Sequence, residues 1–370
     1  MAKIGLGNIT TEVVLEAVER YGSPLYLYDE AAIIRKCRDV LDMPNAFGLT
    51  VRYAQKALLQ LVEKQGLHFD TSTLNEARRA FRAGIPYKKM MLTTQEVPTG
   101  ADRTDLEEMI LQGLVYNVCS LRQLNLIVDF ARQNRVKLSM RVHPGIGTGE
   151  SATRNTGDEY SSFGVHLTNI EEALELAKRN GIIFNQIHVH IGSGGNPQKW
   201  QENVDRELGF VGKYFPDAEI VNFGGGFKEA RMPGEVAADI QELGNYARLK
   251  IIDFYQRTGR KLQVAIEPGT YIMGNAGYIV TTVLDKKYTG PNGFEFIILN
   301  AGMDANARPL FYGSQHTFYV ISKEGKLLSD EFTICHTKSQ VGKRVVVGRC
   351  CESGDSQCLD ANGKNYPREI

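Results

Sequence analysis

Short apolar runs alternate with longer amphipathic segments along most of this chain. Eight of the short runs have the pattern of strands: residues 49–54, 67–72, 90–95, 114–120, 137–144, 185–192, 219–226 and 262–269. Apolar residues recur at helical spacing in the segments between them, for example 74–84, 121–134, 169–181 and 240–259, and several of these end in glycine. Eight strand-then-helix cycles predict an α/β fold with a (β/α)8 TIM barrel. An open doubly wound sheet is the alternative, although the GxGxxG typical of its first turn is absent.

The pattern changes after residue 269. Four β-rich runs follow, broken by Gly and Asn turns, at residues 278–290, 294–302, 317–328 and 344–355. The opening segment contains a strand-like run at 23–29 that could join their sheet. We therefore expect a barrel over residues 33–269 and a second, all-β domain formed by residues 1–32 together with 270–370.

Composition narrows the classes of function. The 370 residues are 42% hydrophobic, and 43 basic residues balance 43 acidic ones, with no run of like charge that would suit a nucleic acid or an acidic membrane. No stretch is long and apolar enough to span a bilayer, and the first residues do not resemble a signal peptide, so we expect a cytoplasmic protein. The six cysteines include no CxxC pair, so the sequence predicts neither a disulfide framework nor a metal site.

A barrel of this kind places its active site at the carboxyl ends of its strands. The polar residues and glycines expected at those ends are Lys56, Asp70, Thr93, Thr94, Arg141, His143, His188, His190, Ser193, Gly224, Gly225, Gly226 and Glu267. Because they fall at one rim, we interpret them as parts of one site.

The residue types at this rim suit an aldehyde cofactor that carries a phosphate. A partly desolvated lysine such as Lys56 can form a Schiff base with a carbonyl. Three consecutive glycines, Gly224–Gly226, let backbone N–H groups surround a phosphate. A carboxylate such as Glu267 can keep a pyridine nitrogen protonated, a role that a raised pKa would oppose, and a histidine ring can cover the cofactor. Pyridoxal 5'-phosphate meets all four requirements.

Each feature also has a simpler interpretation. A strand-end lysine is often a solvated surface residue, and Gly224–Gly226 could be only a tight turn. We expect His188 and His190 to alternate across their strand, so that one faces the barrel interior and the other is structural. On the same ground, a metal-dependent hydrolase that uses both histidines is disfavoured.

Six motifs, in order along nearly the whole chain, resemble one known family. They are YAQK at 53–56, HVHIGSG at 188–194, NFGGGF at 222–227, EPGTY at 267–271, RPLFY at 308–312 and CESGD at 351–355. The chain resembles the alanine-racemase-fold (fold type III) decarboxylases that use pyridoxal phosphate, and among these the diaminopimelate decarboxylase family.

This resemblance implies a role for each matching residue. The cofactor would be bound by Lys56, Asp70, His190, Ser193, Gly224, Gly225, Gly226, Glu267, Gly269 and Thr270. The substrate would meet Arg308, Tyr312 and Glu352. Lys56 would hold the cofactor covalently, and Cys351 would protonate the carbon from which carbon dioxide leaves. The family's CESGD segment reaches the partner subunit's active site, so a homodimer with shared sites is implied.

The implied reaction is the decarboxylation of meso-diaminopimelate to L-lysine, a step of lysine biosynthesis. Three features depart from the family. Thr270 stands where arginine is frequent, Ala57 is followed by Leu58 rather than asparagine in a shorter loop, and the chain ends at Ile370 before a Gly-Ala-Tyr segment, so we expect the β domain to be incomplete. Decarboxylation of D-ornithine, D-lysine or a polyamine precursor, and a non-catalytic dimerising homologue, are the alternatives.

Overall fold

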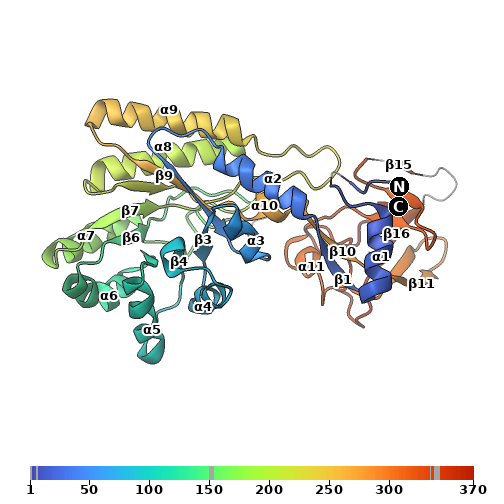
Figure 1. Ribbon diagram of the computed structural model, residues 1–370. Helices are drawn as coiled ribbons and strands as arrows, with labels where there is room; N and C mark the ends of the chain where they lie inside the picture. The colour runs from blue at the N-terminus through green and yellow to red at the C-terminus, as the bar shows by residue number, and fades with distance from the viewer. Residues whose placement is uncertain (1, 6, 150–153, 334, 337–341) are drawn as a thin grey trace. The chain divides into compact units, whose positions relative to one another are not determined.

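The computed structural model describes the whole chain except residues 1, 6, 150–153, 334 and 337–341. One part of it is a closed barrel of eight parallel strands in sequence order, β2 to β9, in which β2 also pairs with β9 (Figure 1). The strands are β2 (Leu49–Ala54), β3 (His68–Thr71), β4 (Met90–Thr93), β5 (Val115–Val118), β6 (Leu138–Arg141), β7 (Phe184–His188), β8 (Ile220–Asn222) and β9 (Gln263–Ile266). The predicted (β/α)8 barrel is confirmed.

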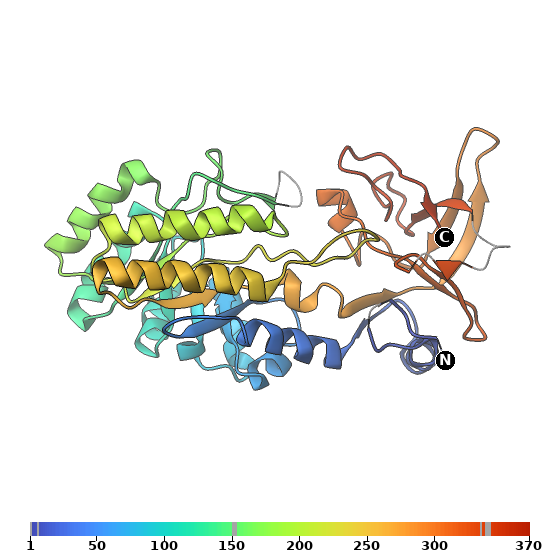
Figure 2. The same ribbon diagram turned by 90° about the horizontal axis from the view of Figure 1, so that it is seen from above.

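One helix precedes β2, and others follow the strands around this barrel. They are α2 (Glu30–Leu41), α3 (Leu59–Lys64), α4 (Leu74–Arg82), α5 (Gly100–Leu111), α6 (Leu121–Asn134), α7 (Ile170–Arg179), α8 (Pro197–Tyr214), α9 (Ile240–Thr258) and the short α10 (Thr270–Met273). Local sequence sets their ends: the Thr73 and Ser120 hydroxyls cap α4 and α6, and Gly259 ends α9 at a φ of 71°. The two longest, α8 and α9, lie side by side (Figure 2).

Several polar side chains are buried inside the barrel. Helices cover the strands, so strand residues such as Val118 and Met140 are fully buried. Several buried strand positions are nevertheless polar: Arg52, Asn117, Ser139, Arg141, Gln186, His188 and Asn222. Arg52 on β2 donates to Gln186 Oε1 on β7 at 3.3 Å. Because β2 and β7 are not neighbouring strands, this hydrogen bond crosses the barrel interior.

The second compact unit comprises residues 1–33, 229–237 and 272–370, and residues 34–228 with 238–271 form the barrel unit. The second unit contains three small sheets, with strand orders β1–β10, β11–β12–β16–β17 and β13–β14–β15. Their strands are β1 (Leu25–Tyr28), β10 (Gly277–Val280), β11 (Val283–Tyr288), β12 (Glu295–Leu299), β13 (Tyr319–Ile321), β14 (Leu327–Asp330), β15 (Cys335–His336), β16 (Lys343–Val347) and β17 (Arg368–Glu369).

This sheet-rich unit is not purely β. It also contains α1 (Thr11–Tyr21) and α11 (Arg308–Tyr312), and Thr10 caps α1 through a hydrogen bond from the Val13 N–H. The segment 229–237, which lies between two barrel elements in the sequence, belongs to this unit as well. The division expected from sequence contains no such excursion, because a linear pattern does not show where a loop packs.

A buried ion pair connects two strand regions of the sheet-rich unit. The Arg368 guanidinium on β17 donates to Glu331 Oε1 at 2.7 Å and to Gln315 Oε1 at 2.6 Å. Only 3% of the Arg368 side chain and 12% of the Glu331 side chain are exposed. Neither charge is well hydrated, so each depends on the other.

Arg368→Met should therefore destabilise this unit by about 3–5 kcal/mol, because it leaves the Glu331 carboxylate buried without its partner. Arg349→Met is the matched control, since Arg349 pairs with Asp304 on the surface and its loss should cost about 1 kcal/mol or less. Urea unfolding followed by circular dichroism measures both values. Equal losses in the two variants would contradict this account.

Candidate active site

Lys56 lies at the mouth of the barrel, two residues after the end of β2. Its side chain is exposed, and a Cβ added to Gly269 would lie 3.6 Å from its Cε. The positive charge of Lys56 also contributes to lowering the pKa of His190. The next residue but one, Leu58, adopts a left-handed conformation with φ 56° and ψ 43°, and α3 starts immediately after it. The amine thus stands beside the residues that follow β7 and β9.

The three glycines after β8 make a turn that larger residues could not adopt. Gly224 has a φ of 66°, and a Cβ there would overlap the carbonyl oxygen of Val189. The Gly224 N–H donates to Asn222 Oδ1 at 3.1 Å, and the Gly225 N–H donates to His190 Nδ1 at 3.0 Å. A Cβ on Gly226 would lie 3.0 Å from the Gly192 carbonyl oxygen, so the turn also reaches the segment that contains Ser193.

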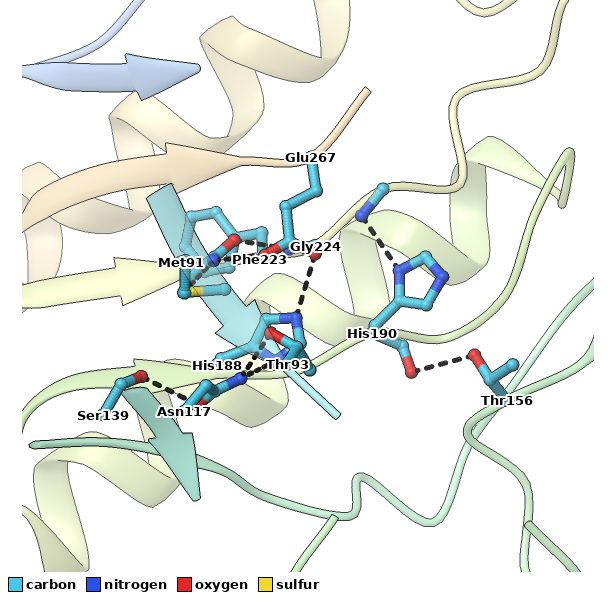
Figure 3. Close-up of polar contacts among 12 residues, drawn as sticks. Met91, Thr93, Asn117, Ser139, Thr156, His188, His190, Phe223, Gly224 and Glu267 are labelled. Atoms are coloured by element: carbon cyan, nitrogen blue, oxygen red, sulfur yellow. Dashed lines mark hydrogen bonds and ion pairs between the residues drawn. The ribbon is translucent and has the colours of Figure 1, made fainter. Parts of the chain in front are cut away.

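Glu267, after β9, is a buried carboxylate held by two side chains. Asn222 Nδ2 donates to its Oε1 at 2.7 Å, and His188 Nε2 contacts its Oε2 at 3.2 Å (Figure 3). Burial acts to raise the pKa of Glu267, but His188, His190 and the Asn222 amide outweigh it and lower the pKa to about 2. Glu267 is therefore an anion at neutral pH, which is the state that pairing with a protonated pyridine nitrogen requires.

Asp70, at the end of β3, has the opposite electrostatic character. Burial, and then repulsion by Glu267, raise its pKa well above the usual range. Its Oδ1 is buried and has no hydrogen-bond partner within the described part of the chain. Two carboxyl groups of one site are thus pushed in opposite directions, Asp70 toward the neutral acid and Glu267 toward the anion.

The expectation that His188 and His190 face opposite sides was wrong. Side chains alternate with a period of two along a strand, so residues two apart share a face, and Val189 points the other way. His188 contacts Glu267 inside the barrel, and His190 accepts from Gly225 at the mouth (Figure 3). Among the residues that the structure describes, no three His, Cys, Asp or Glu side chains are grouped as metal ligands.

Several residues of this site were not predicted from the sequence. They are Arg52, Asn117, Ser139 and Asn222, whereas Arg141 was expected at the rim but was given no role. All five are buried polar residues within barrel strands. Four of them, Arg52, Asn117, Ser139 and Asn222, bond to side chains on or next to other strands, and the Arg141 guanidinium carbon lies 4.7 Å from the Phe163 ring centroid. A polar residue in an otherwise apolar barrel strand was the available signal, because only a functional or fully bonded group is tolerated there.

The residues predicted to bind the substrate and to donate the proton belong to the sheet-rich unit. Arg308 and Tyr312 lie on α11, with the guanidinium carbon 5.9 Å from the ring centroid, and Arg308 also bonds His316 and Ser314. Cys351 and Glu352 are exposed in a turn. Buried Asp355 anchors that turn, since it accepts the N–H groups of Met303 at 2.6 Å and of Cys350 at 2.7 Å.

The barrel residues fit pyridoxal phosphate. Asp70 Oδ1 and Arg141 Nη2 are buried polar atoms without a hydrogen-bond partner in the described residues, and both can serve a polar ligand. The glycine turn leaves no room for side chains, Lys56 offers an amine beside Gly269, and Glu267 is an anion. This fold and this donor set define the class of barrel enzymes that work with a pyridoxal cofactor.

Comparison with known proteins gives the same class. The family described as "Pyridoxal-dependent decarboxylase, pyridoxal binding domain" matches residues 30–274. The diaminopimelate decarboxylase of Escherichia coli is 30% identical over 94% of this chain and 80% of its own length, and that of Streptomyces coelicolor is 30% identical over 92% and 74%. A crystal structure of a diaminopimelate decarboxylase superposes with a TM-score of 0.84 at 25% identity, covering 100% of this chain and 85% of its own.

These matches include both the barrel and the sheet-rich unit. The chain belongs to the diaminopimelate decarboxylase family of fold type III enzymes. No helix in the described ranges has the length and apolar character needed to cross a membrane.

Gly224→Ala should lower the free energy of unfolding by about 2 kcal/mol or more, because the new Cβ meets backbone at a left-handed φ. Gly209→Ala is the control. A Cβ on Gly209 in α8 meets nothing within 4 Å, so alanine should stabilise the helix by about 0.5–1 kcal/mol. Urea unfolding followed by fluorescence of Trp200, the single tryptophan, measures both, and a neutral Gly224→Ala would contradict the described turn.

The barrel should lose stability on mild acidification. Burial lowers the pKa of His190 to about 3, whereas an unfolded histidine takes up its proton near pH 6.5. Between these values the unfolded chain binds one more proton, so this group lowers stability by at most about 1.4 kcal/mol for each unit that the pH falls. Glu267 also lowers the stability as the pH falls below about 4.5, because its pKa is lower in the folded chain than in the unfolded chain. His190→Gln should make the fall in stability between pH 6.5 and 5 shallower, and an unchanged slope would contradict the assignment.

Proposed function

We propose that this chain is a pyridoxal-phosphate-dependent carboxy-lyase that converts meso-diaminopimelate to L-lysine with loss of carbon dioxide. The observation that carries the proposal is the buried anion of Glu267, held by Asn222 and His188 at the same rim as the Lys56 amine. The names of the relatives in Escherichia coli and Streptomyces coelicolor supply the substrate.

When bound, pyridoxal phosphate supplies an electron sink for the bond that breaks as carbon dioxide leaves. Lys56 would bind the cofactor through its amine, and Ser193 with the Gly224, Gly225 and Gly226 turn would bind its phosphate. Glu267 would hold a proton at the pyridine nitrogen. Asp70, Gly269 and Thr270 would complete the contacts. The same rim would thus provide a covalent anchor, a phosphate cradle and a counter-charge.

His190 contributes a flat, neutral ring. Its Nδ1 accepts the Gly225 N–H, so its proton stands on Nε2, and its low pKa keeps the ring uncharged at neutral pH. An uncharged ring can cover the cofactor without competing for the Glu267 carboxylate. The glycine turn therefore orients the histidine as well as the phosphate.

The sheet-rich unit supplies the substrate groups in this proposal. Arg308 and Tyr312 would bind the distal end of the amino acid together with Glu352, and Cys351 would deliver a proton to the carbon that loses carbon dioxide. Asp355 accepts the Cys350 N–H and the Met303 N–H, so it holds the backbone of the Cys351 turn against the segment that contains Met303. We propose a homodimer in which the turn of one subunit serves the site of the other, in the cytoplasm.

Thr270 is the one observation that favours a second substrate. The family resemblance leads us to expect arginine at this position, and the shorter, neutral Thr270 weakens the case for a distal carboxylate. D-ornithine, D-lysine or a polyamine precursor would then replace diaminopimelate, with the chemistry of Lys56 and Glu267 unchanged. The substrate assay below separates these cases.

The purified chain with pyridoxal phosphate should show a visible band that borohydride removes, and peptide mapping should find the reduced cofactor on Lys56. Lys56→Ala should abolish the trapped peptide and reduce carbon dioxide release from meso-diaminopimelate by at least about a thousandfold. Lys64→Ala, at another exposed lysine, is the matched control and should change neither. Trapping at another lysine would refute the proposed site, and faster release from D-ornithine or D-lysine would transfer the proposal to that substrate.

A further inference from the structure

A chain of buried hydrogen bonds leads to Glu267 from the opposite side of the barrel. Ser139 Oγ on β6 donates to Asn117 Oδ1 on β5 at 2.8 Å, and Asn117 Nδ2 lies 2.8 Å from His188 Nδ1 on β7. His188 Nε2 then contacts Glu267 (Figure 3). Asn117, Ser139 and His188 are each at most 1% exposed, so water does not satisfy these groups from outside.

The direction of each bond follows from the roles of the atoms. The Asn117 amide nitrogen has two hydrogens and meets two acceptors, Thr93 Oγ1 at 3.1 Å and His188 Nδ1, while its oxygen meets the Ser139 hydroxyl. Rotation of the amide by half a turn would place one oxygen before both Thr93 and His188 and leave an amide hydrogen without an acceptor. The observed orientation therefore satisfies more of the buried groups.

This orientation decides where the imidazole proton resides. Because the Asn117 amide donates to Nδ1, that nitrogen carries its lone pair, and the single proton of the neutral ring stands on Nε2, facing Glu267. Burial lowers the pKa of His188, which keeps the ring neutral. The charged groups that act on it are Glu267, Arg141 and Arg52.

A second anchor fixes the other oxygen of Glu267. The Gly224 N–H can only donate, and it donates to Asn222 Oδ1, so Asn222 Nδ2 must face Glu267 Oε1. Both carboxylate oxygens thus receive a hydrogen bond from a donor whose own orientation is determined. A protonated Glu267 would need an acceptor that neither neighbour offers.

We propose that Asn117 is a positioning residue that sets the tautomer of His188 and thereby keeps Glu267 in its carboxylate form. This inference deepens the proposed function, because that function relies on the Glu267 anion. A substitution at Asn117 should therefore impair the chemistry without touching cofactor or substrate. An aspartate at 117 can only accept, so it would draw a proton onto His188 Nδ1.

The tautomer can be measured directly on the full chain. Histidine labelled with nitrogen-15 should show, for His188, an unprotonated Nδ1 and a protonated Nε2, with and without added pyridoxal phosphate. His188→Gln assigns the signals among the seven histidines. A protonated Nδ1 in the unsubstituted chain would overturn the proposal, whether or not any variant folds.

Asn117→Asp should protonate Nδ1 and reduce kcat for decarboxylation roughly ten- to a hundredfold, the usual range for partners behind a ligand-binding residue, with little change in KM. Asn203→Asp is the matched control, because Asn203 is equally buried on α8 and contacts the Phe223 carbonyl rather than His188. It should leave the His188 nitrogens unchanged. Unaltered nitrogens in Asn117→Asp would refute the proposal.

The His188→Gln background gives a rescue test. Glutamine offers one amide donor toward Glu267 and has no tautomer to lose, so Asn117→Asp should lower kcat there by less than about threefold. A full ten- to hundredfold loss in that background would show that Asn117 acts in another way. If the unsubstituted chain bound no pyridoxal phosphate and released no carbon dioxide, the proposed function would fail, while the tautomer measurement would still stand.

Discussion

The barrel site depends on keeping one carboxylate charged where water cannot reach it. Glu267 is 6% exposed, and an isolated anion in such surroundings would take up a proton. Two hydrogen bonds, from Asn222 and His188, reverse that tendency. Each donor is oriented by a further group, Asn222 by the backbone of the glycine turn and His188 by Asn117. Asn222 and His188, together with the groups that orient them, thus all serve to stabilise the charge of Glu267.

The same constraint explains the neighbouring charges. Arg52 and Arg141 lie buried in the barrel, and their pKa values are lowered by burial although Glu267 and Asp70 oppose this. Ionising Asp70 as well would be costly, because repulsion by Glu267 adds to the cost of burying its charge. One ionised and one neutral carboxyl beside two guanidinium groups leave net positive charge in the barrel. That balance suits a cofactor with an anionic phosphate.

Sequence reasoning was strongest where a pattern has one structural meaning. All eight barrel strands were predicted, because apolar runs at regular spacing between amphipathic segments have few other solutions. The rim residues Lys56 and Glu267 followed from the rule that strand ends face the mouth. Asn117 was not found, because VYNV reads as an ordinary buried strand and the partners of its amide come from three other strands. The error about His188 and His190 had a different origin: residues two apart along a strand were expected on opposite faces, although they share one face.

The loop after Lys56 contains a residue in a strained backbone conformation, which the sequence indicates only weakly. Leu58 holds a left-handed conformation that costs a residue with a Cβ about 1 kcal/mol or more, whereas asparagine tolerates it better. The short connection forces this turn, because α3 begins at Leu59, only three residues after the lysine. The Tyr53 hydroxyl, which donates to the Ala57 carbonyl at 3.2 Å, ties the loop back to β2. The left-handed turn at Leu58 and the Tyr53 hydrogen bond together restrict the conformations open to the backbone that follows Lys56.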